Sequence, residues 1–499
     1  MKKSILPALL LLTLSSCGTY TKYEPVTQVP DRLYGDSVLG STAVAYDDST
    51  SLGATDWHEL FTDAQLQQYV ERALEQNTDY LQTEQRVEEA AATLKAAKLA
   101  FLPSFALAPQ AGVTSFGNSK ASQTYSIPLN MSWEIDIFGR MRNAKEQAKA
   151  LYAKSKDYRQ AVRTQLVANV ANIYYTLVTL DRELAVSQET EDAWKETLIT
   201  ARALMKAGRY DEAGVSQMEA TLQSVHAGVL DLESQIAQTE NSLAVILGET
   251  PRHYARSSSL QLGSYTLATG VPVQLLSARP DVRQAQHALE SAFYGVNQAR
   301  SAFYPQLTLS GSIGWTNSAG SAIVNPGKFL ASALASLAAP LFTRGQNEAQ
   351  LRIAKAQQEE ARLSFTQTLL NAGKEVNDAL TTYHTADNKQ QTIASQITAL
   401  EKALKSTTLL MDHGSNTYLE VLTARQTLLS ARLSEAANDL AKAQSLINLY
   451  QALGGGQETS SVATTPEKLS ASGTQATASS SASSAADSLS AQAALGQTD

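Results

Sequence analysis

The sequence predicts a mainly α-helical protein with a smaller β part, built from two tandem copies of one unit. Three observations predict this fold. Ala100–Pro103 recurs as Ala302–Pro305, and Leu247-Gly248 recurs as Leu453-Gly454, so related motifs lie about 200 residues apart. Within each copy, long stretches carry apolar residues in steps of four and three. A shorter segment of each copy instead alternates with a period of two, which is typical of strands.

Each copy is predicted to contain a very long helix, a tight turn marked by glycine, and a returning helix. The helices of the first copy are expected at about 140–207 and 209–247, and those of the second at about 346–413 and 415–453. Gly373 is the one glycine or proline inside the long helix of the second copy, so any local break in that helix is expected there. A helix of this length spans roughly 100 Å, which no compact domain needs.

Each copy also carries one predicted β-hairpin, at about 103–137 and 305–341. Asn317–Lys328 is expected as a Gly/Ser/Asn/Pro loop, with Phe329–Pro340 as the returning arm. Two hairpins supply four strands, which cannot close a barrel and leave open edges. Two interpretations remain: a small four-stranded sheet, or several chains that pool their hairpins into one membrane barrel.

The N-terminus has the pattern of a secretory signal. Met1-Lys2-Lys3 precedes an apolar run over 5–14, which is too short to span a bilayer, and Ser15-Ser16-Cys17 follows. Leu14–Cys17 resembles a bacterial lipobox, which implies that residues 1–16 are removed and that Cys17 is lipidated. The alternative is an incidental or buried cysteine. Residues 17–56 then form a lipidated N-terminal segment.

Composition excludes several classes of protein. Lys and Arg number 40 against 48 Asp and Glu, so the formal net charge of −8 argues against nucleic acid as a partner. A mean hydropathy of −0.20 excludes a helical membrane transporter, and a single cysteine excludes an internal disulfide. The six histidines show no metal-ligand spacing, and no phosphate-binding loop is present. We therefore predict no enzyme, no metal and no cofactor.

The Ser/Ala/Thr-rich tail over 457–499 is predicted to be disordered.

Four ordered motifs resemble the TolC-like outer membrane efflux proteins, specifically their lipoprotein branch. The resemblance covers roughly residues 17–456. Its motifs are Trp57–Phe61, Ser132–Arg140, Arg279–Arg283 with Ala299–Pro305, and Tyr450–Gly456. The resemblance divides the chain into a first repeat at 57–250, a linker at 251–278 and a second repeat at 279–456. It also implies that the linker and the segment after Cys17 pack around the middle of the helices.

The resemblance implies a homotrimer whose twelve strands close a barrel in the outer membrane, continued by a periplasmic helical tunnel. Its implied partners are a periplasmic adaptor, an inner-membrane pump of the resistance-nodulation-division type and outer membrane lipid. The expected function is a passive exit duct of a tripartite efflux system. Two alternatives are the exit duct of a type I protein secretion system and a coiled-coil envelope lipoprotein that forms no pore.

A duct needs gates and docking tips. By the resemblance, Glu420 matches an acidic gate position, and Thr423 stands where some members carry a second acid, which weakens a double acidic ring. Three copies of Glu420 around an axis would favour cations; the alternative is a solvated helix residue. The residues expected at the docking tip lie in the two helical turns, where they otherwise serve only as helix caps: Ala207, Gly208, Arg209, Tyr210, His413, Gly414 and Ser415. Asp211 and Glu212 are explained by the helix macrodipole alone.

Overall fold

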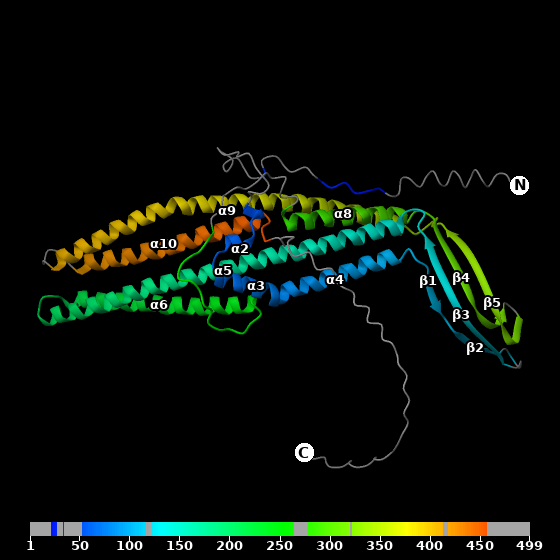
Figure 1. Cartoon of the computed structure of the whole chain (residues 1–499), viewed down its shortest axis with the longest axis horizontal. Coiled ribbons are helices and arrows are strands. Elements are labelled where there is room, and N and C mark those ends of the chain that lie inside the picture. The colour runs from blue at the N-terminus through cyan, green and yellow to red at the C-terminus, as the bar shows by residue number, and fades with distance from the viewer. Residues whose placement is uncertain are drawn as a thin grey trace, which may run out of the picture. The chain divides into compact units, whose positions relative to one another are not determined.

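The computed structural model describes residues 21–26, 33, 52–115, 117, 121–263, 278–319, 322–412 and 418–456. The signal segment 1–16, Cys17, the tail 457–499 and the turn residues His413, Gly414 and Ser415 lie outside these residues. The strands lie at one end of the long helices, and the α5–α6 turn lies at the other (Figure 1). No helix among the described residues is long and apolar enough to cross a membrane.

The two long helices have equal length. They are α5 (Arg140–Lys206) and α9 (Gln346–Asp412), with 67 residues each. Their returning partners, α6 (Glu212–Ile246) and α10 (Tyr418–Ala452), have 35 residues each. The predicted apolar seam of α5 is buried at Leu166, Val170 and Leu177. Each return helix packs along its own long helix, and α10 also packs against α5.

The break expected near Gly373 does not occur, because α9 is continuous from Gln346 to Asp412. The main-chain oxygen and side chain of Leu33 occupy the place where a Cβ of Gly373 would stand. Ala372 and Val376 beside it are fully buried. Glycine here serves a close approach of the N-terminal segment to the helix, which is a tertiary requirement invisible to local propensity.

Shorter helices precede each hairpin and were not among the predicted elements. The 3₁₀ turn η3 (Leu52–Ala54) leads into α2 (Trp57–Leu60), and α3 (Ala64–Gln76) and α4 (Thr78–Leu99) follow. In the second repeat α8 (Pro280–Ser301) takes the same place before its hairpin. Two N-caps carry a readable sequence signal: Asp63 accepts from the amides of Gln65 and Leu66, and Asn77 from that of Tyr80.

The strands form one antiparallel sheet in the order β1-β3-β4-β5, with β2 beside β1 on β3 (Figure 1). The first arm of the first hairpin is split into β1 (Ser104–Leu107) and β2 (Gln110–Thr114), which pair with β3 (Ser122–Ile135) in one continuous register. Pro109 lies at the break and Pro128 lies opposite it; neither has an N–H to donate. The ladder therefore weakens at this point without shifting.

The predicted loop over 317–328 is wrong for most of its length. The second hairpin consists of β4 (Gln306–Ala319) and β5 (Ala322–Ala338), with a register shift between Thr316 and Ser318. Asn317 lies in this irregularity, and its side chain bonds to the neighbouring strand β3. Its Oδ1 accepts from the Tyr125 amide at 2.7 Å, and its Nδ2 donates to the Gln123 oxygen at 2.9 Å. These bonds continue the pairing where the β4 backbone leaves the ladder.

The sheet has one apolar and one polar face. Cross-strand pairs on the first include Leu129 with Ile313 and Trp133 with Leu309, whereas Asn130 faces Ser312 on the second. Phe105 of β1 and Phe329 of β5 are 63% and 64% exposed. Among the described strands, β1, β2 and β5 each pair along one side only. An apolar face and two open edges remain uncovered within one chain.

The largest core lies where α3, α5, α9 and α10 meet the linker between the repeats. Buried Tyr174 donates to Asp63 Oδ2 at 2.6 Å and accepts from the Ser257 amide at 3.0 Å. Arg256 of the linker pairs with Asp181 of α5 at 2.5 Å and with Glu240 of α6 at 2.6 Å. The described part of the linker thus lies across α5 and α6 and is held by buried polar contacts.

Candidate functional site: the helical turns and the face of α10

The turn between α5 and α6 has a tight C-terminal cap. The Gly208 amide donates to Met205 O and the Arg209 amide to Leu204 O, both at 2.9 Å, which is the Schellman pattern. Gly208 has a φ of +68°, a left-handed conformation that glycine adopts at low cost. Asp211 then caps α6 by accepting from the Gly214 amide at 2.6 Å. The local sequence alone accounts for this sharp reversal.

The predicted tip residues of this turn do not all face solvent. Ala207, Gly208 and Arg209 are exposed, whereas Tyr210 is half-buried. The Tyr210 ring lies against Gly214 and packs on a small apolar cluster, so it braces the turn from inside. The cluster joins the end of α5 and the start of α6 to the start of α10, and its members include Trp194, Met218 and Leu422. Of the four tip residues predicted in the α5–α6 turn, three are exposed.

The two predicted gate residues lie on the same face of α10. Glu420 and Thr423 are both exposed, while Val421 and Leu422 between them are buried against the rest of the bundle. Thr423 Oγ1 donates to the Leu419 oxygen of its own helix at 2.9 Å. Glu420 lies in the first turn of α10, where the helix dipole favours an anion.

Sequence reasoning missed Arg425, which links α10 to α5 two residues beyond Thr423. Its Nη1 donates to the main-chain oxygen of Ala193 at 2.7 Å. Its Nε is buried and has no hydrogen-bond partner among the described residues. Burial lowers the pKa of the Arg425 guanidinium, and the nearby charge of Glu196 acts in the opposite direction. No local pattern distinguishes this arginine from a solvated one, because its acceptor is a carbonyl 232 residues earlier in the chain.

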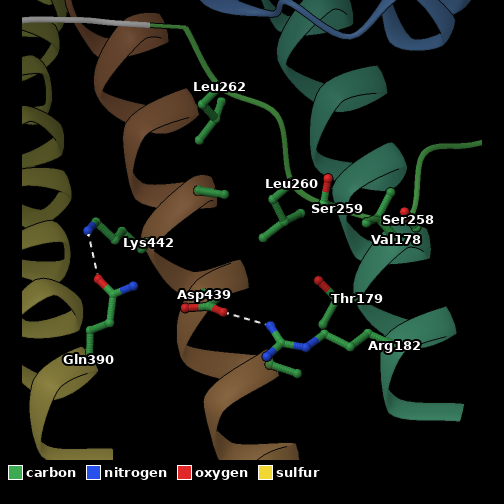
Figure 2. Close-up of a pocket in the computed structure, with 12 residues that line it drawn as sticks. Val178, Thr179, Arg182, Ser258, Ser259, Leu260, Leu262, Gln390, Asp439 and Lys442 are labelled. Atoms are coloured by element: carbon green, nitrogen blue, oxygen red, sulfur yellow. Dashed lines mark hydrogen bonds and ion pairs between the residues drawn. The ribbon is translucent and has the colours of Figure 1, made fainter. Parts of the chain in front are cut away.

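A cavity of about 430 Å³ lies between α5 and α10 beneath the linker (Figure 2). Leu260 and Leu262 of the linker lie across it, and Arg182 of α5 reaches Asp439 of α10 at 2.8 Å. Arg182 also pairs with Glu435 at 2.6 Å. The linker therefore covers one face of α10 near the middle of the helix. The ion pairs of Arg182 join α5 to α10 beside this cavity.

Two buried tyrosines of the core have raised pKa values, so their hydroxyl groups stay neutral and act as hydrogen-bond partners. Burial, with Asp63 beside it, raises the pKa of Tyr174 to about 12. Burial also raises the pKa of Tyr450, whose hydroxyl accepts from the Gly456 amide at 2.7 Å. Within the described part of the chain, no group of three or more His, Cys, Asp or Glu side chains is arranged to hold a metal ion. These tyrosines are structural links.

The sequence matches the outer membrane efflux protein family over residues 69–249 and 271–455. It is 28% identical to the cation efflux system protein CusC of Escherichia coli K12, over 91% of this chain and 99% of CusC. It is 26% identical to the "Probable outer membrane lipoprotein SilC" of Salmonella typhimurium, over 81% of this chain and 88% of SilC. The open-state MtrE outer membrane channel of Neisseria gonorrhoeae superposes with a TM-score of 0.78 at 26% identity, covering 88% of this chain and 98% of MtrE.

Proposed function

The chain belongs to the outer membrane efflux protein family and is a non-enzymatic outer membrane efflux channel, and we propose that it acts as a homotrimeric, passive exit duct. Relatives are named as a cation efflux system protein and as the outer membrane protein of a solvent efflux pump, which supports a place for this chain in a tripartite efflux system with a periplasmic adaptor and an inner-membrane pump as its partners. We assign that pump to the resistance-nodulation-division type. Energy for export then comes from the pump, and this chain supplies the route through the outer membrane.

The observation that carries the trimer is the amphipathic sheet with its uncovered edges. Four arms per chain cannot close, and Phe105 and Phe329 leave apolar surface exposed on the edge strands β1 and β5. When three copies join β5 of one to β1 and β2 of the next, twelve arms close without an edge. The apolar face then meets lipid and the Ser/Thr/Asn face lines the lumen, as in membrane barrels.

The turns at the other end of the helices supply the entrance and the docking surface. We assign Glu420 to an acidic ring at the constriction, with Thr423 one helical turn further in. The exposed residues Ala207, Gly208 and Arg209 are assigned to contact with the adaptor, together with His413, Gly414 and Ser415 of the second turn. Three glutamates around one axis attract cations and repel anions at this point.

Lipidation at Cys17 would hold the trimer at the outer membrane from its periplasmic side, and multiple acyl chains hold stably where one does not. Metabolic labelling with palmitate tests this assignment. Incorporation of label into the wild type and its loss in Cys17→Ser are expected. Equal labelling of both proteins would rule Cys17 out as the modified residue.

Single-channel recording of the purified protein in a planar bilayer tests the duct. We expect discrete conductance from a trimeric species, and we expect Glu420→Ala to raise resting conductance or weaken block by cations. Glu233→Ala is the matched control, because Glu233 is an exposed glutamate in the middle of α6. A monomeric mass in detergent together with no conductance under any gate-opening condition would refute the duct. Unchanged conductance and cation block in Glu420→Ala would remove only the gate assignment.

A further inference from the structure

Helix α10 separates its charged side chains from its open face. Of its six charged residues, all but Glu420 point toward neighbouring helices. Arg425 donates to Ala193 O of α5, and Glu435 and Asp439 pair with Arg182 of α5. Arg432 pairs with Glu401 of α9 at 3.0 Å, and Lys442 with Asp387 of α9 at 2.6 Å. Charge on α10 is therefore used to join helices.

The open face of α10 begins at Glu420 and carries no further charge. Its members recur in steps of three and four, at the helical period, and in the first half they bear only hydroxyl or methyl groups: Thr423, Thr427, Ser430, Ser434, Ala437 and Ala441. Gln444, Asn448 and Gln451 continue the same row. The carboxamide of Gln451 donates to Gln165 of α5 at 2.5 Å, so the uncharged surface extends onto the next helix.

The direction of this face follows from what covers the others. α9 flanks α10 on one side and α5 flanks it on the other. The linker covers a third side, where Leu260 and Leu262 share a cavity with Asp439 and Ala443 (Figure 2). At 100° per residue, Ala437 and Ala441 lie about 160° and 200° from Asp439, on the opposite side. A single layer of helices wrapped into a tunnel has its lumen opposite the covering segment.

Two hollows lie along the open face of α10, and their position supports the conclusion that this face is directed away from the linker. They run between α9 and α10, with volumes of about 360 and 760 Å³, and include Ala441, Gln444 and Ser434 in their walls. α9 brings Glu375, Asp378 and Lys389 to them. Both carboxylates are paired within the chain, Glu375 with Arg279 and Asp378 with Lys374, each at 2.7 Å. The hollows are thus polar with largely compensated charge.

We propose that the row from Thr423 to Gln451 is the wall of the tunnel, and that charge selection along α10 is confined to Glu420 at its entrance. This inference rests on the proposed duct. Beyond the acidic ring, hydroxyl and carboxamide groups offer weak hydrogen bonds to solutes of either charge and to neutral ones. The wall thus suits organic molecules whose charge differs from one substrate to the next, with one ring that discriminates between them.

The corresponding row of α6 in the first repeat carries the same kind of residue. Positions 206 residues before Thr423, Thr427, Ser430 and Ser434 hold Gln217, Thr221, Ser224 and Gly228. Asp231, which corresponds to Ala437, is the first charged residue in this row. The tandem duplication therefore repeats an uncharged surface nearest the entrance, where each solute first meets the wall.

Thiol labelling of the open channel tests the direction of the face. Ser434→Cys is treated with a cationic or an anionic methanethiosulfonate, and the K⁺/Cl⁻ permeability ratio is measured at 0.1 M and 1 M salt. Cys17 is the chain's one natural cysteine, so labelling reports the introduced thiol. Ser258→Cys is the matched control, an exposed serine of the linker on the covered side.

We expect the cationic label at position 434 to lower the ratio severalfold and the anionic label to raise it. Both effects should fade at 1 M salt, where the screening length falls from about 10 Å to about 3 Å. The Ser258→Cys channel should keep the wild-type ratio. Complete labelling at 434, verified by mass, with an unchanged ratio in conducting channels would overturn the proposal. Absence of any wild-type conductance would instead refute the duct itself.

A second measurement tests the confinement of charge selection. Glu420→Gln keeps the size of the side chain and removes its charge, so we expect the cation preference to disappear. A variant that conducts with the full wild-type preference would place the selective charge elsewhere on the wall. Glutamine can still form hydrogen bonds at the helix terminus, so the variant is expected to fold. Loss or retention of the cation preference then reports the charge of Glu420 and not misfolding.

Discussion

Gly373 of α9 lies directly against Leu33 of the N-terminal segment, whose main-chain oxygen and side chain fill the space of a Cβ. Further along α8, toward the strands, Asn297 donates to Thr21 Oγ1 at 3.0 Å, and Tyr23 packs against Phe293 with ring centroids 5.6 Å apart. The described pieces of the N-terminal segment therefore contact the second repeat at two places. In a lipidated chain, such contacts connect the lipid-bearing end to the helical tunnel.

Gly373→Ala should destabilise the protein although alanine is the better helix former. The added methyl would meet a backbone oxygen, which cannot move aside as a flexible side chain does. Gly228→Ala is the control, because nothing lies within 4 Å of the corresponding position in α6. That variant should gain about 0.5–1 kcal/mol from helix propensity. Thermal unfolding at one protein concentration checks both, and an equal gain in the two variants would contradict the packing argument.

Arg425→Met should leave the thermal midpoint equal to or above that of the wild type. Methionine fills a similar volume between α10 and α5 and removes a buried charge whose Nε has no partner among the described residues. Arg425→Ala should lower stability by about 2 kcal/mol, because a cavity remains beside Trp194 and Leu422. The comparison is made by thermal unfolding. A fall of the same size in both variants would show that the guanidinium itself is required.

Asn317→Ala should loosen the tip of the second hairpin. It leaves the Tyr125 amide and the Gln123 oxygen without their side-chain partner, at a cost of about 1–3 kcal/mol for each group that stays buried. Asn317→Asp retains the acceptor and loses the donor, so an intermediate loss is expected. Heat dissociation of the trimer followed by gel electrophoresis measures the order. Wild-type stability in Asn317→Ala would mean that water replaces both bonds.

Asp63 should make stability fall in acid. Burial alone would raise the pKa of this carboxyl, but hydrogen bonds from Ser257, Tyr174 and two main-chain amides outweigh burial and hold the pKa below its ordinary 3.8. The folded pKa is depressed, so the contribution is present above pH 3.8 and is lost as the pH falls through the folded value. Asp63→Asn should lose this part of the acid dependence.

Thermal midpoints across this pH range compare Asp63→Asn with the wild type and with Asp211→Asn. The second variant changes an exposed N-cap of α6 and tests whether loss of any cap carboxylate has the same effect. The two proteins with an intact Asp63 should converge on Asp63→Asn in acid. Parallel curves for all three would show that Asp63 adds nothing to the pH dependence.

Local patterns were sufficient to predict the long helices and the turn that joins α5 to α6. The helix predicted at 140–207 is α5, Arg140–Lys206, because a stretch without Gly or Pro and with a repeating apolar seam has no place to end before Gly208. The same reasoning failed at Gly373 and over 317–328. Gly373 serves a contact with Leu33, and Asn317 bonds to strand β3 nearly 200 residues earlier, so both depend on partners distant in sequence.

The sequence by itself determined the duplicated architecture, the lengths of α5 and α9, the hairpins and the position of Glu420 in the first turn of α10. Only the tertiary structure decided which side of α10 is open. Arg182 finds Asp439 across 257 residues of chain, and the linker covers the helix at Leu260. Periodicity places residues on a face of a helix, but it does not say which neighbour meets that face. That choice is made by packing between distant segments, and it is what leaves an uncharged row open beyond Glu420.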